Sequence, residues 1–184
     1  MYPKVKSQLQ DYVCVLRNVS LYKYDHFAQI LNGQIFLERC TIAENPEALY
    51  QTGMIQHFKE ETAYGMDCLH KAMTSGHLDA TYAVGMILIL KDSESKNNGM
   101  QMIYDLKKIN CTKTKFEEIH QKFLQRLLWI KNSFIVGRKM PICCKNHNVK
   151  DSGWKDFKDL DLDCHHCCCD QEIVHLWKHL PQSV

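Results

Sequence analysis

The hydrophobic and small residues in the middle of the chain recur in two consecutive segments, 45–78 and 79–109. Three pairs of positions match at an offset of 32 residues and three more at an offset of 34: Ala48/Ala80, Tyr50/Tyr82, Gly53/Gly85, Gly65/Gly99, Met66/Met100 and Leu69/Ile103. A period of about 34 residues is typical of stacked helix pairs. The alternative is two unrelated helical hairpins that share alanine and glycine by chance, and six matches in nearly one register disfavour it. The pattern therefore predicts one helical hairpin in each segment.

Local signals support these hairpins. Asn45 is a good N-cap, Pro46 suits the first helical position, and Glu47 favours the positive end of the helix dipole. Gly76 has the position of a C-terminal stop. The polar stretch 91–98, KDSESKNN, predicts a loop between the two helices of the second hairpin.

Apolar residues at helical intervals flank the repeats on both sides. We expect these stripes to pack as caps, because two repeats alone bury too little surface to be stable. The glycine at position 33 makes the upstream helix less certain, and His120 on the downstream helix is interpreted as a surface or core histidine. The stripes are Phe27, Ile30, Leu31 and Ile35 upstream and Phe116, Ile119, Phe123, Leu127 and Ile130 downstream. Separately, the tail contains a predicted short amphipathic helix with Ile173, Val174, Leu176, Trp177 and Leu180.

The pattern as a whole predicts an all-α protein in three parts. Residues 1–25 precede the repeats, residues 26–136 form the helical repeat domain with its capping helices, and residues 137–184 form a small Cys/His-rich tail. The tail begins where the arginine, lysine, methionine and proline of residues 138–141 end the helical pattern.

Composition narrows the functional classes. Hydrophobic residues make up 45% of the 184 residues and charged residues 24%, which is ordinary for a chain with a buried core. The net charge of +2 is too small to predict a nucleic-acid or membrane partner. The longest apolar run, residues 83–90, is far shorter than the roughly 20 residues of a membrane-spanning helix, and the N-terminus does not have the pattern of a secretory signal. We expect an intracellular protein, cytoplasmic or nuclear, with reduced thiols.

Four of the ten cysteines fall in the six residues CHHCCC, 164–169. Cys144 with His147, and Cys164 with Cys167, form two pairs with sixteen residues between them. This spacing is typical of a four-ligand zinc knuckle, in which each pair lies on a tight turn. Several neighbouring residues could replace a ligand: Cys143 in the first pair, and His165, His166, Cys168 or Cys169 in the second. The alternative is a set of reduced cysteines on a buried turn, or a degenerate knuckle.

A zinc ion in this tail would have a structural role. Four protein ligands close the coordination shell, whereas a catalytic zinc keeps an open position, and the chain has no H-E-x-x-H motif. Residues 143–184 contain five lysines and seven acidic residues, which opposes phosphate binding. The sequence also has no P-loop, nucleophile elbow or dinucleotide-binding glycine motif, so we expect a protein that is not an enzyme.

The stretch NPEALYQTGM, 45–54, followed by the stretch 65–90, resembles plant F-box proteins with a Sel-one-like repeat region related to TPR repeats. FLERC at 36–40, LWIKN at 128–132 and the stretch 164–176 also have counterparts, so the resemblance covers about four fifths of the chain. It implies a right-handed superhelix of paired helices. It also implies the substrate-binding region of an SCF ubiquitin ligase receptor.

The resemblance does not extend to the F-box, the three-helix segment that grips an SKP adaptor in that family. The stretch starting at Asp11-Tyr12-Val13 looks like the end of that module, so residues 1–25 are interpreted as a remnant. Adaptor binding is therefore not assigned to any residue here.

The leading hypothesis is a non-enzymatic module whose helical repeats bind a protein or peptide partner in a concave groove. The candidate groove residues are Tyr50, His57, Tyr82 and Tyr104, for which packing between helices is the alternative. A second hypothesis is a zinc-dependent enzyme or a nucleic-acid-binding zinc protein. A third is a truncated copy without a function of its own.

Overall fold

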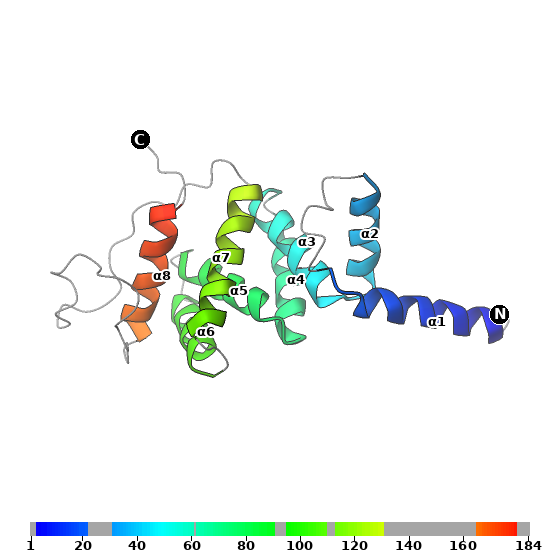
Figure 1. Ribbon diagram of the computed structural model, residues 1–184, viewed down its shortest axis with the longest axis horizontal. Coiled ribbons are helices and arrows are strands. Elements are labelled where there is room, and N and C mark those ends of the chain that lie inside the picture. Colours follow the sequence, from blue (N-terminus) through cyan, green and yellow to red (C-terminus); the bar gives the residue numbers. More distant parts are fainter. Residues whose placement is uncertain are drawn as a thin grey trace. The chain divides into compact units, whose positions relative to one another are not determined.

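The computed structural model describes residues 3–21, 31–60, 62–90, 95–109, 113–130 and 165–179, and all regular structure in these ranges is α-helical (Figure 1). This confirms the all-α prediction. The chain divides into two compact units, residues 1–84 and 85–184, and the division lies within α5. Both predicted domain limits, at residues 25 and 136, fall outside the described residues. The helices are α1 (Pro3–Asn18), α2 (Leu31–Ile42), α3 (Pro46–Phe58), α4 (Ala63–Thr74), α5 (Leu78–Leu90), α6 (Lys96–Ile109), α7 (Lys113–Ile130) and α8 (His165–His179).

In the first hairpin, helices α3 and α4 cross each other at glycine residues. A Cβ atom on Gly53 would lie 2.7 Å from Leu69 Cγ and 3.0 Å from the carbonyl oxygen of Gly65. A Cβ atom on Gly65 would meet the backbone of Gln56 and His57. Real Cβ contacts are longer than these, so the two helix backbones approach to a distance that only glycine allows.

The second hairpin, α5 with α6, repeats this crossing. A Cβ atom on Gly85 would lie 2.9 Å from Ile103 Cδ1 and 3.3 Å from the carbonyl oxygen of Gly99. These are the residues that the sequence offsets pair with the first crossing. The two tyrosines of the pattern are also buried alike, because Tyr50 is 1% and Tyr82 0% exposed. The predicted duplication is therefore confirmed.

The turn that enters each hairpin is duplicated as well. Residues 44 and 76, again 32 apart, have positive φ angles, 59° at Glu44 and 83° at Gly76. Each donates its N–H to the carbonyl oxygen three residues earlier, Thr41 at 3.0 Å and Met73 at 2.9 Å. Such a left-handed residue ends one helix and redirects the chain into the next. The predicted stop at Gly76 is confirmed.

The residue after each turn caps the following helix. The side chain of Asn45 accepts the N–H of Ala48 at Oδ1, 3.1 Å away. His77 accepts the N–H of Ala80 at Nδ1, 3.2 Å away. The prediction of an Asn45 cap is confirmed, whereas the equivalent role of His77 is not apparent from residue preferences, because histidine is not among the favoured N-caps.

Helix α2 belongs to the same pattern. Its first and last residues lie 32 positions before those of α4, and its buried glycine, Gly33, lies 32 positions before Gly65. We interpret α2 as the second helix of a preceding repeat, so Gly33 fits the helix instead of weakening it. The predicted core stripe is wrong at Ile35, which is 44% exposed because it lies on the outer side of α2. Phe27 and Ile30 of that stripe lie outside the described residues.

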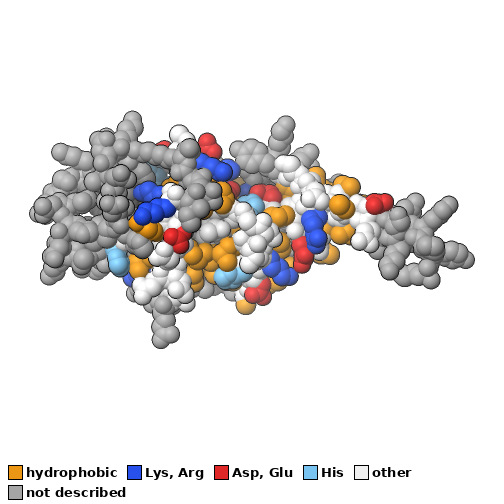
Figure 2. Space-filling view, turned by 90° about the horizontal axis from the view of Figure 1, so that it is seen from below, with side chains coloured by type: hydrophobic (Ala, Val, Ile, Leu, Met, Phe, Trp, Pro, Cys, Tyr) orange, Lys and Arg blue, Asp and Glu red, His pale blue; other side chains and the backbone are white. Residues whose placement is uncertain are grey.

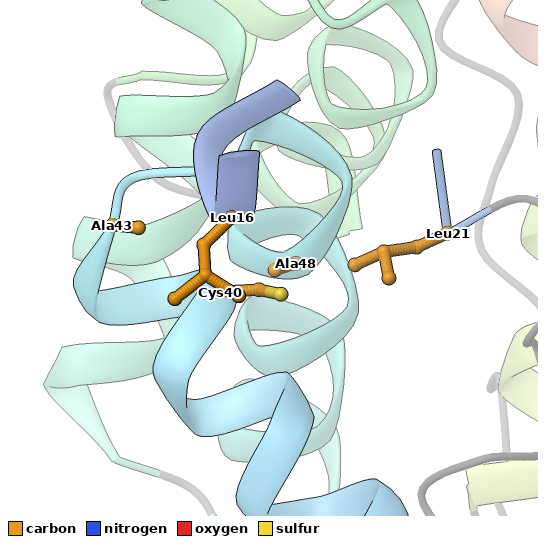
Figure 3. Packing of buried hydrophobic residues seen from close by; sticks show 5 residues of the cluster. All are labelled: Leu16, Leu21, Cys40, Ala43 and Ala48. Atoms are coloured by element: carbon orange, nitrogen blue, oxygen red, sulfur yellow. The ribbon is translucent and has the colours of Figure 1, made fainter. Parts of the chain in front are cut away.

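A small hydrophobic core joins the first helices. It contains Leu16, Leu21, Cys40, Ala43 and Ala48, which come from α1, α2, α3 and the adjoining turns (Figure 3). Burying a leucine contributes about 1.5–3 kcal/mol. This core anchors α1 to the repeat region.

The side chain of Asn45 strengthens this junction. Its Nδ2 lies 2.9–3.0 Å from the carbonyl oxygens of Leu16, Arg17 and Val19. Two of these carbonyls belong to the last turn of α1, where no intrahelical donor is available. One asparagine therefore caps the start of α3 and satisfies the end of α1.

The later helices agree with the sequence in type but not in every boundary. The downstream stripe is buried in α7 at Phe116, Ile119, Phe123 and Leu127. Helix α6 begins at Lys96, so the predicted loop 91–98 is too long at its end. The turn predicted around the second cysteine pair is wrong in its second half, because residues 165–179 form the helix α8. None of the helices in the described ranges combines the length and apolarity needed to cross a bilayer.

Candidate interaction surface

The two repeat tyrosines predicted to contact a partner lie in the interior. The Tyr50 ring stacks on the ring of His77, with 5.0 Å between centroids. His77 in turn places Nε2 2.8 Å from Oε2 of Glu47. Tyr82 is fully buried. The burial of both side chains favours the packing role that the sequence left as the alternative.

The other two predicted contact residues have different surroundings. His57 is partly exposed and its ring meets Phe58 edge to face, at 4.9 Å between centroids. Tyr104 belongs to the second unit, is 8% exposed, and has the ammonium of Lys108 4.6 Å from its ring centroid. Of the four residues, His57 is therefore the most accessible. Partner binding at these four positions stays a prediction.

An exposed apolar face occurs instead on α2 and α4 of the first unit. Ile35 and Ile42 are 44% and 75% exposed, and their spacing of seven residues places them on one side of α2. Glu38, also exposed, lies between them on the same side. Tyr64, in the first turn of α4, is 52% exposed. We call Ile35, Glu38, Ile42 and Tyr64 the α2–α4 face.

Electrostatics connects the two helices of this face. A hydrogen bond with Cys68, partial burial and the negative charge of Glu38 raise the pKa of Tyr64 to about 12. The phenol of Tyr64 is therefore protonated at neutral pH. The effect of Glu38 on Tyr64 places these two side chains, one from each helix, within electrostatic range of each other. Burial also raises the pKa values of the Cys68 and Cys40 thiols, which keeps both thiols protonated.

The described surface carries charges of both signs. On the face shown in Figure 2, blue and red side chains alternate with hydrophobic ones, without a large area of one sign among the coloured residues. This distribution agrees with the small net charge. It suits a contact made through shape and apolar area better than one made through charge attraction.

The predicted zinc ligands are not tested by the described residues. Cys144, its alternative Cys143, His147 and Cys164 lie outside them. Cys167 lies in the first turn of α8, but its side chain is not described. Within the ranges that the structure describes, no three His, Cys, Asp or Glu residues are arranged to hold a metal ion. The zinc site therefore stays a prediction.

Comparison with known proteins agrees with the repeat geometry. Residues 23–128 match the family model of plant tetratrico peptide repeats. This chain belongs to that family. The matched span contains α2 through most of α7, and thus both glycine crossings and the α2–α4 face.

The chain is also similar to a curated plant protein. In an alignment over 154 residues that covers 74% of the chain, it is 30% identical to the Arabidopsis thaliana protein named "Putative F-box protein At1g67623". The match covers 52% of that relative, so the chain spans about half the length of the curated protein it matches. No solved structure matches. The family and the relative together support a role in protein interaction.

Proposed function

We propose that this member of the plant tetratrico peptide repeat family is a protein-binding module whose contact surface includes the α2–α4 face. The exposure of Ile42 and Tyr64 on a scaffold with glycine-locked helices supports this proposal most directly. A rigid scaffold loses little conformational entropy on binding, and large exposed apolar side chains supply the anchors of an interface.

The partner we propose is a protein recruited for ubiquitination, as in the substrate-binding region of an F-box protein. The similarity to the Arabidopsis protein named as a putative F-box protein supports this more specific assignment. We assign adaptor binding to no residue of this chain.

A capture experiment tests the surface. The purified chain is immobilised, exposed to plant extract, and the bound proteins are quantified by mass spectrometry. Ile42→Lys and Tyr64→Ala alter the α2–α4 face, whereas the control Val15→Lys alters α1, where Val15 is 64% exposed. Ile42→Lys is a surface change of the kind that shifts stability by about 0.5 kcal/mol. Tyr64→Ala also removes the hydrogen bond with Cys68, so the melting temperature of each variant is compared with that of the wild type.

The result we expect is a bound protein whose amount falls at least about tenfold with either face variant and stays unchanged with the control. Direct titration with that purified protein then gives the affinity of each variant. Equal capture by all three variants would remove the α2–α4 face from the proposal. Failure to enrich any protein over empty beads would remove the interaction role itself.

The zinc knuckle of the tail is a separate proposal. Cys144, His147, Cys164 and Cys167 would hold one structural zinc ion, which would contribute folding energy to the tail. Metal analysis of the purified chain should find about one zinc per chain, reduced in Cys164→Ser. A chain purified without zinc that gains no structure when zinc is added would contradict the site.

A further inference from the structure

Helices α7 and α8 are joined by a line of buried hydrogen bonds. His120 of α7 places Nδ1 2.7 Å from Oε2 of Glu172. Its other ring nitrogen, Nε2, faces Nδ1 of His175 within hydrogen-bond distance. His120 is 3% exposed and Glu172 is 0% exposed. The junction therefore places a carboxylate and two imidazole rings in series, largely away from water.

The number of protons in this series is limited by geometry. Oε2 of Glu172 accepts the hydrogen bond, so Nδ1 of His120 carries a hydrogen. The two facing nitrogens of His120 and His175 have room for one hydrogen between them, which either ring can donate. When both rings are fully protonated, two N–H groups face each other and the hydrogen bond is lost. The series thus tolerates one extra proton but not two.

The surroundings of His175 add to this limit. The titratable and charged groups that act on it are His120 from α7 and Glu172, Lys178 and His179 from α8. α6 also packs against α8, and there Sγ of Cys169 lies 3.7 Å from the carbonyl oxygen of Met100, a contact between neutral groups. Burial first, and then His120 and His179, lower the pKa of His175 to about 4. Electrostatics and geometry therefore oppose the same protonation.

We propose that Glu172, His120 and His175 form an acid-sensitive clasp, which fastens α8 to α7 at neutral pH and opens when acid leaves both histidine rings fully protonated. The clasp does not depend on the proposed partner-binding function. Because α8 also packs against α6, the open clasp weakens only one of its two attachments, and separation from both helices would expose Ile173 and Leu176, which are 6% and 0% exposed while α8 is docked. At acidic pH, the apolar side of the amphipathic helix α8 would then be exposed to solvent.

The direction of the pH effect follows from linkage. The pKa of His175 in the docked state, about 4, is below its value of 6.5 in a detached helix. The detached state therefore binds more protons between these values, so docking is complete above about pH 6.5 and weakens as the pH falls toward 4. At about pH 5 the docking equilibrium should be roughly ten- to thirtyfold weaker than at about pH 7.5.

Hydrogen exchange of the full chain tests the clasp. Exchange in residues 165–179 is measured near pH 7.5 and near pH 5, and each rate is corrected for the intrinsic pH dependence of exchange. In His175→Asn, the amide oxygen replaces Nδ1 as acceptor but cannot take a proton. His70→Gln is the control, because His70 is an exposed histidine of α4 and is not among the groups that act on His175. The wild type and the control should lose roughly ten- to thirtyfold protection in acid, and His175→Asn less than about threefold.

Three results would overturn the clasp: unprotected α8 near neutral pH, equal protection of the wild type at both pH values, or full acid sensitivity in His175→Asn. If α8 is already undocked in His175→Asn at neutral pH, the clasp is tested instead by NMR titration of the histidine rings in the wild type. The clasp requires a midpoint near 4 for His175, and a midpoint near 6.5 contradicts it.

Discussion

The two glycine-crossed hairpins share a backbone arrangement but differ in how they are anchored. The first turn of α3 is held by Asn45, which also binds the carbonyl oxygens at the end of α1. The corresponding residue of α5, His77, caps its helix and reaches back to Glu47. Five of the six residues 82–87 in α5 are apolar side chains 0–2% exposed. Both hairpins thus begin at a polar cap, but the Asn45 cap also joins the end of α1, whereas the His77 cap joins the start of α3.

This difference shows which features a repeat must keep. Close helix approach and a left-handed entry turn recur in both hairpins, because they set the backbone geometry. The chemistry of the cap and of the outer face is free to diverge, since many side chains can stabilise the same backbone. Exchanging equivalent residues between the hairpins should therefore reveal which stabilising contacts are local.

The largest effect should come from filling a crossing. Gly65→Ala places a Cβ against the backbone of Gln56 and His57, which cannot move without separating α3 from α4. We expect the free energy of unfolding to fall by about 3 kcal/mol. Urea denaturation followed by circular dichroism measures the loss, with the exposed neighbour Asp67→Ala as control.

The matching change in the second hairpin, Gly99→Ala, would meet the Gly85 carbonyl oxygen at 2.6 Å and should also be strongly destabilising. If only one of the two glycines were sensitive, the crossings would not be equivalent.

Exchanging the caps should have the next largest effect. Asn45→His keeps an acceptor for α3 but leaves the carbonyl oxygens of Leu16 and Val19 without their buried donor, at a cost of about 2 kcal/mol. His77→Asn keeps a favourable cap and loses the contact with Glu47, so its cost should stay below about 1 kcal/mol. Thermal unfolding of both variants gives the order, and a reversed order would refute the assignment of Asn45 as the bridge to α1.

The first glycine of each crossing gives a finer comparison. Alanine at position 53 would lie 2.7 Å from the branched Cγ of Leu69, whereas at position 85 it would meet the end of the Ile103 side chain at 2.9 Å. The end of the Ile103 side chain can move, whereas the branch point of Leu69 cannot. Gly53→Ala should therefore destabilise the protein by about 1 kcal/mol more than Gly85→Ala. Parallel urea titrations measure this difference. Equal losses would show that both hairpins relax alike.

The smallest effect should appear at the entry turns. Glu44 has φ of 59°, which glycine adopts without strain. Glu44→Gly should therefore change stability by less than about 1 kcal/mol and in the stabilising direction. Its ion pair with Arg17 is exposed and contributes little. Gly76→Ala, at φ of 83°, should destabilise by about 1 kcal/mol. Calorimetry of the pair checks the signs, and the same sign for both would contradict equivalent turns.

Much of the repeat was predictable because its signals are local or periodic. Asn45 and Gly76 have residue types with strong positional preferences, and the glycines of the crossings recur at offsets of 32 and 34 residues. The α2–α4 face was not predictable in this way. Ile35 fits an apolar helical stripe in the sequence, and only the packing of α2 shows that it faces outward.

The sequence by itself determined an all-helical chain with a duplicated hairpin, because helix periodicity and the space between two close helices restrict residue type at regular intervals. Only the tertiary structure decided which of those side chains are buried and which distant residues meet. His120 pairs with Glu172 and His175 across 52 and 55 residues. No local preference encodes such a contact, because it arises from the way separate helices pack together.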